Sequence, residues 1–373
     1  MKSAAVVGGG VFGVTAALAL ARRGFRVILV DEGPIPHPLA ESTDISKVVR
    51  ADYGSDEIYT EMAERALAGW RDWNRKWGEP LYHETGVTFL TRSPMAQGGF
   101  EHESYQLLSR RGHRLQRLQG SEIRKRFPAW GPKWTDGYYN PEGGFAESGR
   151  VVARLAAEAR AAGVDVQLRR CASLDELAAD RVVVTAGSWT TDLIPTLKPS
   201  LRQIGQPVFH LQPTEKDLFD AKQFPVFGAD IAQTGYYGFP INGDGIVKIA
   251  NHGVGTPIHP DSDDRRVTQD QTDSLRSFLS ESFPALANAP LASTRVCVYC
   301  DTKDEHFWIA RSPEDPRVTV AAGGSGHAFK FAPLLGDLIA DAVEDEPNPL
   351  LERFRWRPEV ASKGEEAARH RDD

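Results

Sequence analysis

The chain has 373 residues, of which 41% are hydrophobic and 25% charged, and its net charge is −7. This length and balance are typical of a globular protein with about two domains. The acidic net charge and the lack of long Lys/Arg runs argue against a nucleic-acid partner. No stretch of about 18 apolar residues occurs, so we expect no membrane partner. Three cysteines cannot form a disulfide framework in a chain this long, which favours a cytoplasmic protein.

A strand, a glycine loop, a helix and a second strand follow one another at the N-terminus. Residues 3–7 are apolar and read as a strand, and residues 8–13 (GGGVFG) form a G-x-G-x-x-G loop. An Ala/Leu-rich helix is predicted over 14–23 and a buried strand over 25–30, ending at Asp31. The register of all four parts predicts a βαβ dinucleotide-binding unit.

Each glycine of this loop has a distinct expected role. Gly8 allows a tight turn, Gly10 lets a pyrophosphate approach the backbone, and Gly13 lets the helix pack closely on the strand. Asp31 is placed to accept hydrogen bonds from ribose hydroxyls. The alternative is a glycine-rich turn without a ligand, and the fingerprint alone does not separate NAD from FAD. The cofactor-binding residues predicted here are Gly8, Gly10, Val11, Phe12, Gly13 and Asp31.

Residues 40–54 carry two cations at a suggestive spacing. The segment contains the cap-forming residues Ser42 and Thr43, which indicate a helix start. At helical spacing the apolar residues form one face, while Lys47 and Arg50 lie three residues apart on another. Two interpretations stay open: a surface helix with a solvated basic face, or a pair of cations directed at a carboxylate.

Further strands that end in small-residue turns occur at 181–189 and 317–324. Together with the first strand they predict one parallel sheet assembled from distant segments, and therefore an α/β fold. The intervening regions have shorter strands, prolines and aromatic residues, which favours a second domain with an antiparallel sheet, inserted twice. The predicted domains are 1–85, 145–205 and 306–373 for the dinucleotide, and 86–144 and 206–305 for the substrate.

A hairpin is predicted around the turn at 242–245 (NGDG). A four-residue loop places Phe239 opposite Lys248, so that Tyr237, Lys248 and His252 share a face. A lysine among aromatic side chains is unusual in a buried hairpin. The alternative is an edge-strand lysine that points into water.

Two of the three cysteines, Cys297 and Cys300, are separated by two residues. This spacing is found in metal sites and in redox dithiols. A zinc site needs two further Cys or His ligands at suitable spacing, and Cys171 has no partner nearby. A redox dithiol is expected at a helix N-terminus, whereas residues 295–299 alternate like a strand. No metal site is predicted.

Several separated segments resemble one family, the FAD-dependent amine oxidases that include monomeric sarcosine oxidase, N-methyltryptophan oxidase, pipecolate oxidase and the fructosyl amino acid oxidases. The likeness spans almost the whole chain and implies an FAD-binding, Rossmann-like fold of the glutathione-reductase type. The matching segments are residues 8–13 (GGGVFG), 50–54 (RADYG), 122–128 (EIRKRFP), 186–189 (AGSW), 236–240 (YYGFP) with Lys248, 297–307 (CVYCDTKDEHF) and 323–331 (GGSGHAFKF).

The resemblance implies a role for each matching residue. Cys297 matches the cysteine that forms a thioether to the flavin 8α-methyl group, whereas Cys300 looks coincidental. Lys330 and Arg50 match the pair that binds the substrate carboxylate. His327 matches a histidine beside the substrate amine and the flavin. Lys248 matches the lysine that is held near flavin N5 and used for oxygen activation.

The remaining candidates follow from the same comparison of motifs. Tyr237, His252 and Lys47 join the catalytic group, and residues 323–331 are expected to turn backbone N–H groups towards the flavin ring. The implied reaction is oxidation of an amino acid with a secondary amine, with O₂ as acceptor. The further cofactor-binding residues are Ser42, Thr43, Ser46, Lys47, Gly187, Trp189, Cys297, Gly324, Gly326, His327 and Lys330.

The motifs do not identify the substrate. Lys47 stands where sarcosine oxidases have arginine and fructosyl amino acid oxidases have lysine, while His252 follows the sarcosine oxidases instead. The chain between 168 and 181 is also too short for the β-meander of the relatives. Alternatives are a fructosyl amino acid oxidase, a flavin dehydrogenase with a protein acceptor, and an NAD(P)-dependent opine-type dehydrogenase. We expect a monomer or a small homo-oligomer.

Overall fold

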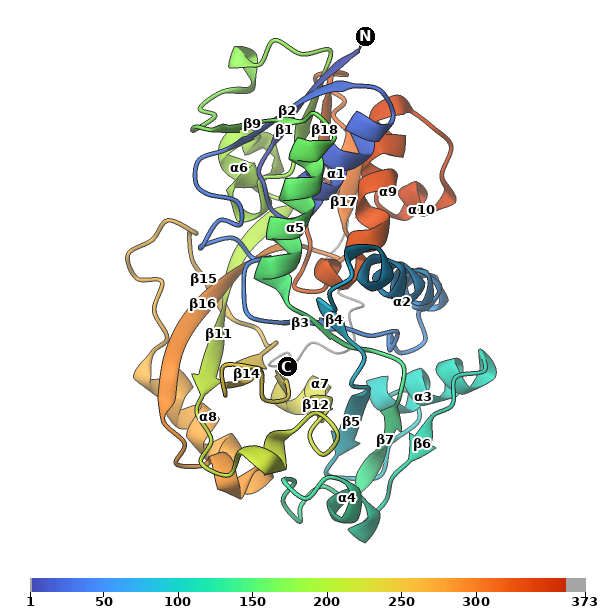
Figure 1. Ribbon diagram of the computed structural model, residues 1–373, viewed down its shortest axis with the longest axis vertical. Coiled ribbons are helices and arrows are strands. Elements are labelled where there is room, and N and C mark those ends of the chain that lie inside the picture. The colour runs from blue at the N-terminus through green and yellow to red at the C-terminus, as the bar shows by residue number, and fades with distance from the viewer. Residues whose placement is uncertain (1, 360–373) are drawn as a thin grey trace.

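The structure is a computed structural model that describes residues 2–359 (Figure 1). Helices cluster around one sheet at one end of the molecule, and a larger sheet lies at the other end. The α-helices are α1 (Val11–Arg22), α2 (Glu57–Trp77), α3 (Phe100–Arg110), α4 (Ser121–Arg126), α5 (Ser148–Ala161), α6 (Thr190–Leu193), α7 (Ile231–Thr234), α8 (Gln269–Ser282), α9 (Ala332–Glu344) and α10 (Pro349–Arg353).

A six-stranded sheet brings together distant parts of the chain. Its order is β17 (Trp308–Arg311), β18 (Val318–Ala322), β10 (Arg181–Val184), β1 (Ser3–Val7), β2 (Arg26–Asp31) and β9 (Asp165–Leu168). All neighbours are parallel except the β17–β18 pair. The central strands are apolar and buried because helices cover the sheet. This confirms the predicted α/β sheet built from discontinuous segments.

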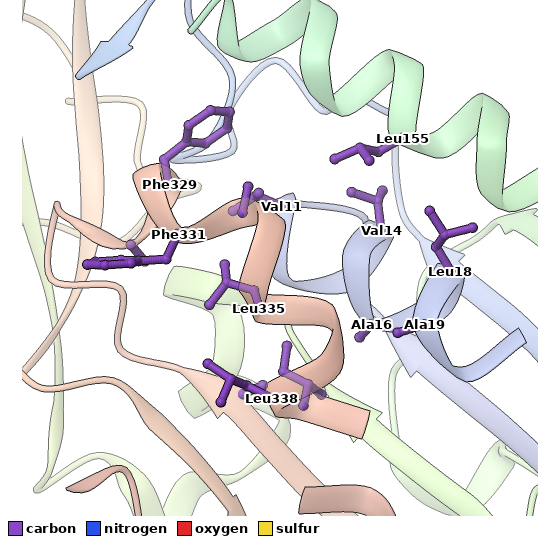
Figure 2. Close-up of a cluster of buried hydrophobic side chains, with 14 of the residues drawn as sticks. Val11, Val14, Ala16, Leu18, Ala19, Leu155, Phe329, Phe331, Leu335 and Leu338 are labelled. Atoms are coloured by element: carbon purple, nitrogen blue, oxygen red, sulfur yellow. The ribbon is translucent and has the colours of Figure 1, made fainter. Parts of the chain in front are cut away.

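Helices α1 and α9 pack tightly against each other beside the six-stranded sheet. Figure 2 shows Val14 and Leu18 of α1 in the same apolar cluster as Leu335 of α9. The close approach depends on Gly336, because a Cβ atom there would lie 2.5 Å from the Thr15 carbonyl oxygen. Helix α1 begins at Val11, three residues earlier than predicted, so the end of the glycine loop forms the first helical turn.

The larger sheet has the order β15 (Thr256–Pro257), β11 (Leu201–Leu211), β14 (Val247–Asn251), β13 (Tyr236–Gly238), β12 (Val226–Ala229), β5 (Val87–Thr91), β7 (Asp136–Asn140) and β6 (Gln116–Arg117), and β16 (Leu291–Thr302) also pairs with β11. In the β13–β14 hairpin Tyr237 pairs with Ala250, and the Phe239 N–H donates to the Lys248 carbonyl oxygen. The predicted hairpin register is confirmed, and Lys248 is 1% exposed, so the alternative of a lysine pointing into water is wrong.

A small sheet corrects the prediction for residues 40–54. Its strands are β3 (Lys47–Val49), β8 (Gly144–Ala146) and β4 (Tyr82–His83), with β3 and β4 both antiparallel to β8. The predicted helix is wrong, because pairing with β8 holds Lys47 to Val49 extended. Arg50 is 7% exposed, so the solvated basic face is wrong as well.

Across residues 2–359, none of the helices combines the length and apolar character needed to cross a bilayer. The division into two domains stays a prediction. Residue 1 and residues 360–373, which the prediction assigns to the dinucleotide-binding domain, lie outside the described part of the chain.

Candidate active site

A cavity of about 540 Å³ opens where the carboxyl ends of β1, β2 and β10 meet the loop after β18. This edge of a parallel sheet is where dinucleotides bind in such folds. Most of the predicted cofactor residues come together in its wall. Those that line it are Gly8, Gly10, Val11, Phe12, Asp31, Ser42, Lys47, Gly187, Trp189, Gly324 and Gly326.

The glycine loop packs too closely against neighbouring backbone for side chains at Gly8 and Gly13. Gly8 has φ +104°, and a Cβ atom there would lie 2.6 Å from the Thr185 carbonyl oxygen. Gly13 does not line the cavity; a Cβ atom on it would lie 1.7 Å from the Gly8 oxygen. Helix α1 starts after Gly10 with no side-chain cap, and its positive end faces the cavity.

Asp31 fixes the loop from the end of β2. Its carboxylate accepts hydrogen bonds from the N–H groups of Gly9 at 2.6 Å and Gly33 at 3.0 Å. A carboxylate has lone pairs left beyond these two bonds, so the expected contact with ribose hydroxyls is compatible with this arrangement.

Two buried hydroxyl groups in the segment 40–54 lack a hydrogen-bond partner among the described residues. Thr43 Oγ1 and Ser46 Oγ have no hydrogen-bond partner within residues 2–359, although both atoms are buried. Ser42 Oγ, by contrast, accepts from the Val11 N–H at 3.2 Å. Unsatisfied buried polar atoms are rare in folded proteins and often mark the position of a ligand. Neither Thr43 nor Ser46 lines either cavity, so the fit to a bound dinucleotide depends on the glycine cradle and the residues in the cavity wall.

A second, smaller cavity of about 60 Å³ adjoins the first. The residues shared by both walls are Lys47, Gly326 and Phe329. Six of the predicted catalytic residues line the smaller cavity. These are Lys47, Arg50, Tyr237, His252, His327 and Lys330.

A hydrogen-bond chain runs along one wall of the smaller cavity. The Lys330 ammonium donates to the Tyr53 hydroxyl at 2.8 Å, which lies 3.0 Å from His327 Nδ1. His327 Nε2 lies 2.9 Å from the Glu305 carbonyl oxygen, which can only accept. Nε2 of His327 therefore carries a proton, and the Tyr53 hydroxyl links the Lys330 ammonium to Nδ1. Sequence reasoning missed Tyr53, although it lies in the RADYG segment.

Arg50 is held by aromatic rings. Its guanidinium carbon lies 5.1 Å from the ring centre of Tyr53, 5.6 Å from Phe89 and 5.4 Å from Phe100. Such cation–π contacts keep a guanidinium charged in an apolar environment. Arg50 and Lys330 thus present two cations to one small cavity.

Lys248 is not among the described residues that line either cavity. Its ammonium lies 2.7 Å from Asp44 Oδ2, donates to the Ser46 carbonyl oxygen at 2.6 Å, and lies 4.7 Å from the Phe239 ring centre. Burial lowers the pKa of Lys248 to about 8, although Asp44 opposes this shift. His210 contacts the other Asp44 oxygen at 3.3 Å.

The two neighbouring cysteines point to opposite faces of β16. Cys297 Sγ lies 3.7 Å from Lys47 Nζ and 3.7 Å from the Glu41 carbonyl oxygen, both from residues that line the larger cavity. Cys300 lines that cavity, whereas Cys297, the predicted tether, is not among the described residues that line either cavity. The C-x-x-C pair makes no joint site, and no cluster of metal-ligating side chains occurs in residues 2–359.

Comparison with known proteins identifies the dinucleotide. A family model described as FAD dependent oxidoreductase matches residues 3–342. The chain is 31% identical over 354 residues to monomeric sarcosine oxidase from Bacillus sp. (strain B-0618), with 90% of both chains covered. It is 29% identical over 391 residues to N-methyl-L-tryptophan oxidase from Yersinia pestis (strain Pestoides F), with 94% of this chain and 98% of the relative covered.

Solved structures show the same fold. Fructosamine oxidase (Amadoriase II) from Aspergillus fumigatus matches with a TM-score of 0.84 at 24% identity, covering 100% of this chain and 94% of that chain. The chain belongs to the FAD dependent oxidoreductase family. This membership confirms the resemblance and favours FAD over the NAD(P)-dependent alternative.

Proposed function

We propose that this enzyme is an oxidase of an amino acid whose nitrogen carries an alkyl group or lies in a ring. The observation that carries the proposal is the junction of the two cavities at Lys47, Gly326 and Phe329. It lets the reactive end of a cofactor in the larger cavity meet a small molecule held by Arg50 and Lys330 in the smaller one.

The two cations select an anionic substrate. A carboxylate between the Arg50 guanidinium and the Lys330 ammonium would be paired twice, which offsets the cost of burying it. Tyr237, His252 and His327 then surround the amine end. His327 Nε2 already donates to the Glu305 carbonyl oxygen, and no side chain need act as a strong base provided that the substrate amine binds in its neutral form.

The predicted cofactor residues that line the larger cavity would hold FAD there, with the start of α1 at its pyrophosphate and Lys47 at its ring end. When bound, FAD supplies the acceptor for hydride from the carbon next to the amine and the route of the electrons to O₂, which yields H₂O₂. The imine product hydrolyses in water. Lys248 supplies a fixed positive charge behind the ring site, and Cys297 is the tether for covalent attachment.

Two experiments test this function. The purified protein is denatured in SDS, and yellow colour that stays with the polypeptide supports the covalent tether. Peroxide release is then measured with sarcosine, N-methyl amino acids, pipecolate and fructosyl-glycine. Turnover with an artificial dye but not with O₂ would favour the alternative of a dehydrogenase with a protein acceptor, and no flavin reduction by any secondary amine would reject the proposal.

A second candidate, a fructosyl amino acid oxidase, is favoured by one observation. Lys47, the residue type that this class carries, lines both cavities. The small volume of the inner cavity, about 60 Å³, and its apolar residues Val87, Phe89 and Val226 favour a smaller and less polar substrate. Ranking sarcosine against fructosyl-glycine by kcat/KM distinguishes the two candidates.

A further inference from the structure

A partly buried acid that the proposed reaction does not use lies in the wall of the larger cavity. Glu41 precedes Ser42 and lines this cavity together with Lys47, Cys300 and Gly326. One carboxylate oxygen accepts the Cys300 N–H at 3.3 Å, and the Gly326 N–H donates a second hydrogen bond. The carboxylate therefore bridges β16 and the loop after β18.

This position is at the reactive end of the cofactor site. Gly326 belongs to the three residues that the two cavities share, so any ring that reaches the substrate must pass beside it. The other carboxylate oxygen of Glu41 is 3.6 Å from where a Cβ atom on Gly324 would stand. The carboxylate thus lies beside Gly324, which also lines the larger cavity.

Charges of both signs lie around Glu41. Lys47 favours the ionised carboxylate, whereas Asp301 disfavours it, and the Tyr299 hydroxyl and the Cys300 thiol are neutral because burial raises the pKa of each. Burial is the largest influence and raises the pKa of Glu41 to about 7. The carboxyl group is accordingly poised between its two forms near neutral pH.

We propose that Glu41 contacts the flavin ring and takes up a proton when the bound cofactor is reduced. The inference rests on the proposed function, because it requires FAD with its ring at the Lys47 end. Reduction by two electrons places negative charge next to a carboxylate whose ionised form is already disfavoured by burial. Protonation of Glu41 relieves that repulsion. The electrons come from the amine substrate and the proton from solvent, so charge is balanced.

The number of protons taken up with the two electrons gives the test. The midpoint potential of the holoenzyme is measured against pH with a redox dye, since each proton contributes about 30 mV per pH unit in a two-electron couple. Above about pH 7.5 the wild type should show close to two protons, or about 60 mV per pH unit, because one proton goes to the cofactor and one to Glu41. Glu41→Gln should take up one proton, or about 30 mV per pH unit. Its midpoint potential at about pH 8 should be higher than that of the wild type, because the negative charge of the Glu41 carboxylate is gone.

Glu32→Gln provides the matched control, because it makes the same carboxylate-to-amide change at the Asp31 end of the cavity and should keep the two-proton slope. Equal slopes in wild type and Glu41→Gln would overturn the inference. Should Glu41→Gln fail to fold, proton uptake by the wild type on photoreduction is measured with a pH indicator, and one proton at every pH would also overturn it. A purified protein that neither contains nor binds FAD would instead refute the proposed function.

Discussion

The Lys330 ammonium donates a hydrogen bond to the Tyr53 hydroxyl at 2.8 Å, so the cation expected to bind the substrate is fixed before any substrate arrives. The Lys330 backbone is fixed as well, because its carbonyl oxygen accepts from the Trp70 indole N–H at 2.7 Å. A preorganised cation loses little entropy on binding a carboxylate. Removal of either the cation or its anchor should therefore be visible in binding.

Lys330→Met should weaken substrate binding. A hydrogen bond between charged partners is worth about 1.5–3 kcal/mol, which corresponds to a roughly 10- to 150-fold higher dissociation constant. The measurement is flavin bleaching under anaerobic conditions at increasing substrate concentration. Lys222→Met, a change at an exposed lysine, serves as the control. An unchanged dissociation constant in Lys330→Met would place the substrate carboxylate elsewhere.

Tyr53→Phe should disturb the same wall through both of its neighbours. Lys330 loses an acceptor and His327 Nδ1 loses its hydrogen-bond partner, although the ring stays in place. We expect about tenfold weaker substrate binding, since one buried hydrogen-bond partner costs about 1–3 kcal/mol. Tyr236→Phe is the matched control, because that hydroxyl bonds to Ser274 outside both cavities. Equal binding in the two variants would show that Tyr53 has no part in positioning.

Cys297→Ala should release the flavin from the denatured polypeptide, and Cys171→Ser should not. Cys297 Sγ lies 3.7 Å from Lys47 Nζ, and Lys47 lines both cavities. Cys300→Ser also should retain the colour, because burial raises the pKa of the Cys300 thiol and suppresses its thiolate. The measurement is flavin fluorescence of the protein band after SDS electrophoresis. Colour kept by Cys297→Ala but lost by Cys300→Ser would reverse the assignment.

The fold could be predicted because the sequence patterns that determine it are local. Parts of the site could not be predicted, because they depend on contacts between distant segments. Strand, glycine loop and helix follow one another at the N-terminus, and the NGDG turn determines the hairpin register that brings Lys248 to the same face as Tyr237. The ion pair that holds the buried Lys248 ammonium was not predictable, because its partner, Asp44, comes from a distant segment of the chain. Residues 40–54 were predicted as a helix because a spacing of three residues cannot reveal a pairing with β8.

For two site residues, Glu41 and Tyr53, the local sequence pattern did not indicate a role. Glu41 is an ordinary acid in a polar stretch, and its importance arises only from the N–H groups that β16 and the loop after β18 direct at it. Tyr53 stands in a matching segment, but its role depends on Lys330 and His327, which are more than 270 residues away in the chain. Contacts between distant segments, rather than residue types, define these roles.

The reaction with O₂ should depend on the charge of Lys248 and therefore on pH. Burial lowers the pKa of Lys248 to about 8, so the ammonium is present below that pH and is lost as the pH rises through it. Reoxidation of the reduced enzyme should slow above about pH 8, and Lys248→Met should be slow throughout, by roughly 10²- to 10³-fold, as when a preorganised charge-stabilising group is removed. Stopped-flow mixing of the reduced enzyme with O₂ measures this rate.

Asp44→Asn tests the same charge without removing the lysine. Asp44 lies 2.7 Å from the ammonium and opposes the effect of burial on the Lys248 pKa, so its loss should lower that pKa further. The decline in reoxidation should then move to lower pH, while the rate well below the new pKa approaches that of the wild type. His210→Gln, which leaves the Asp44 carboxylate in place, should shift the profile much less. A profile that is unchanged in Asp44→Asn would mean that Lys248 is not the group that controls the reaction with O₂.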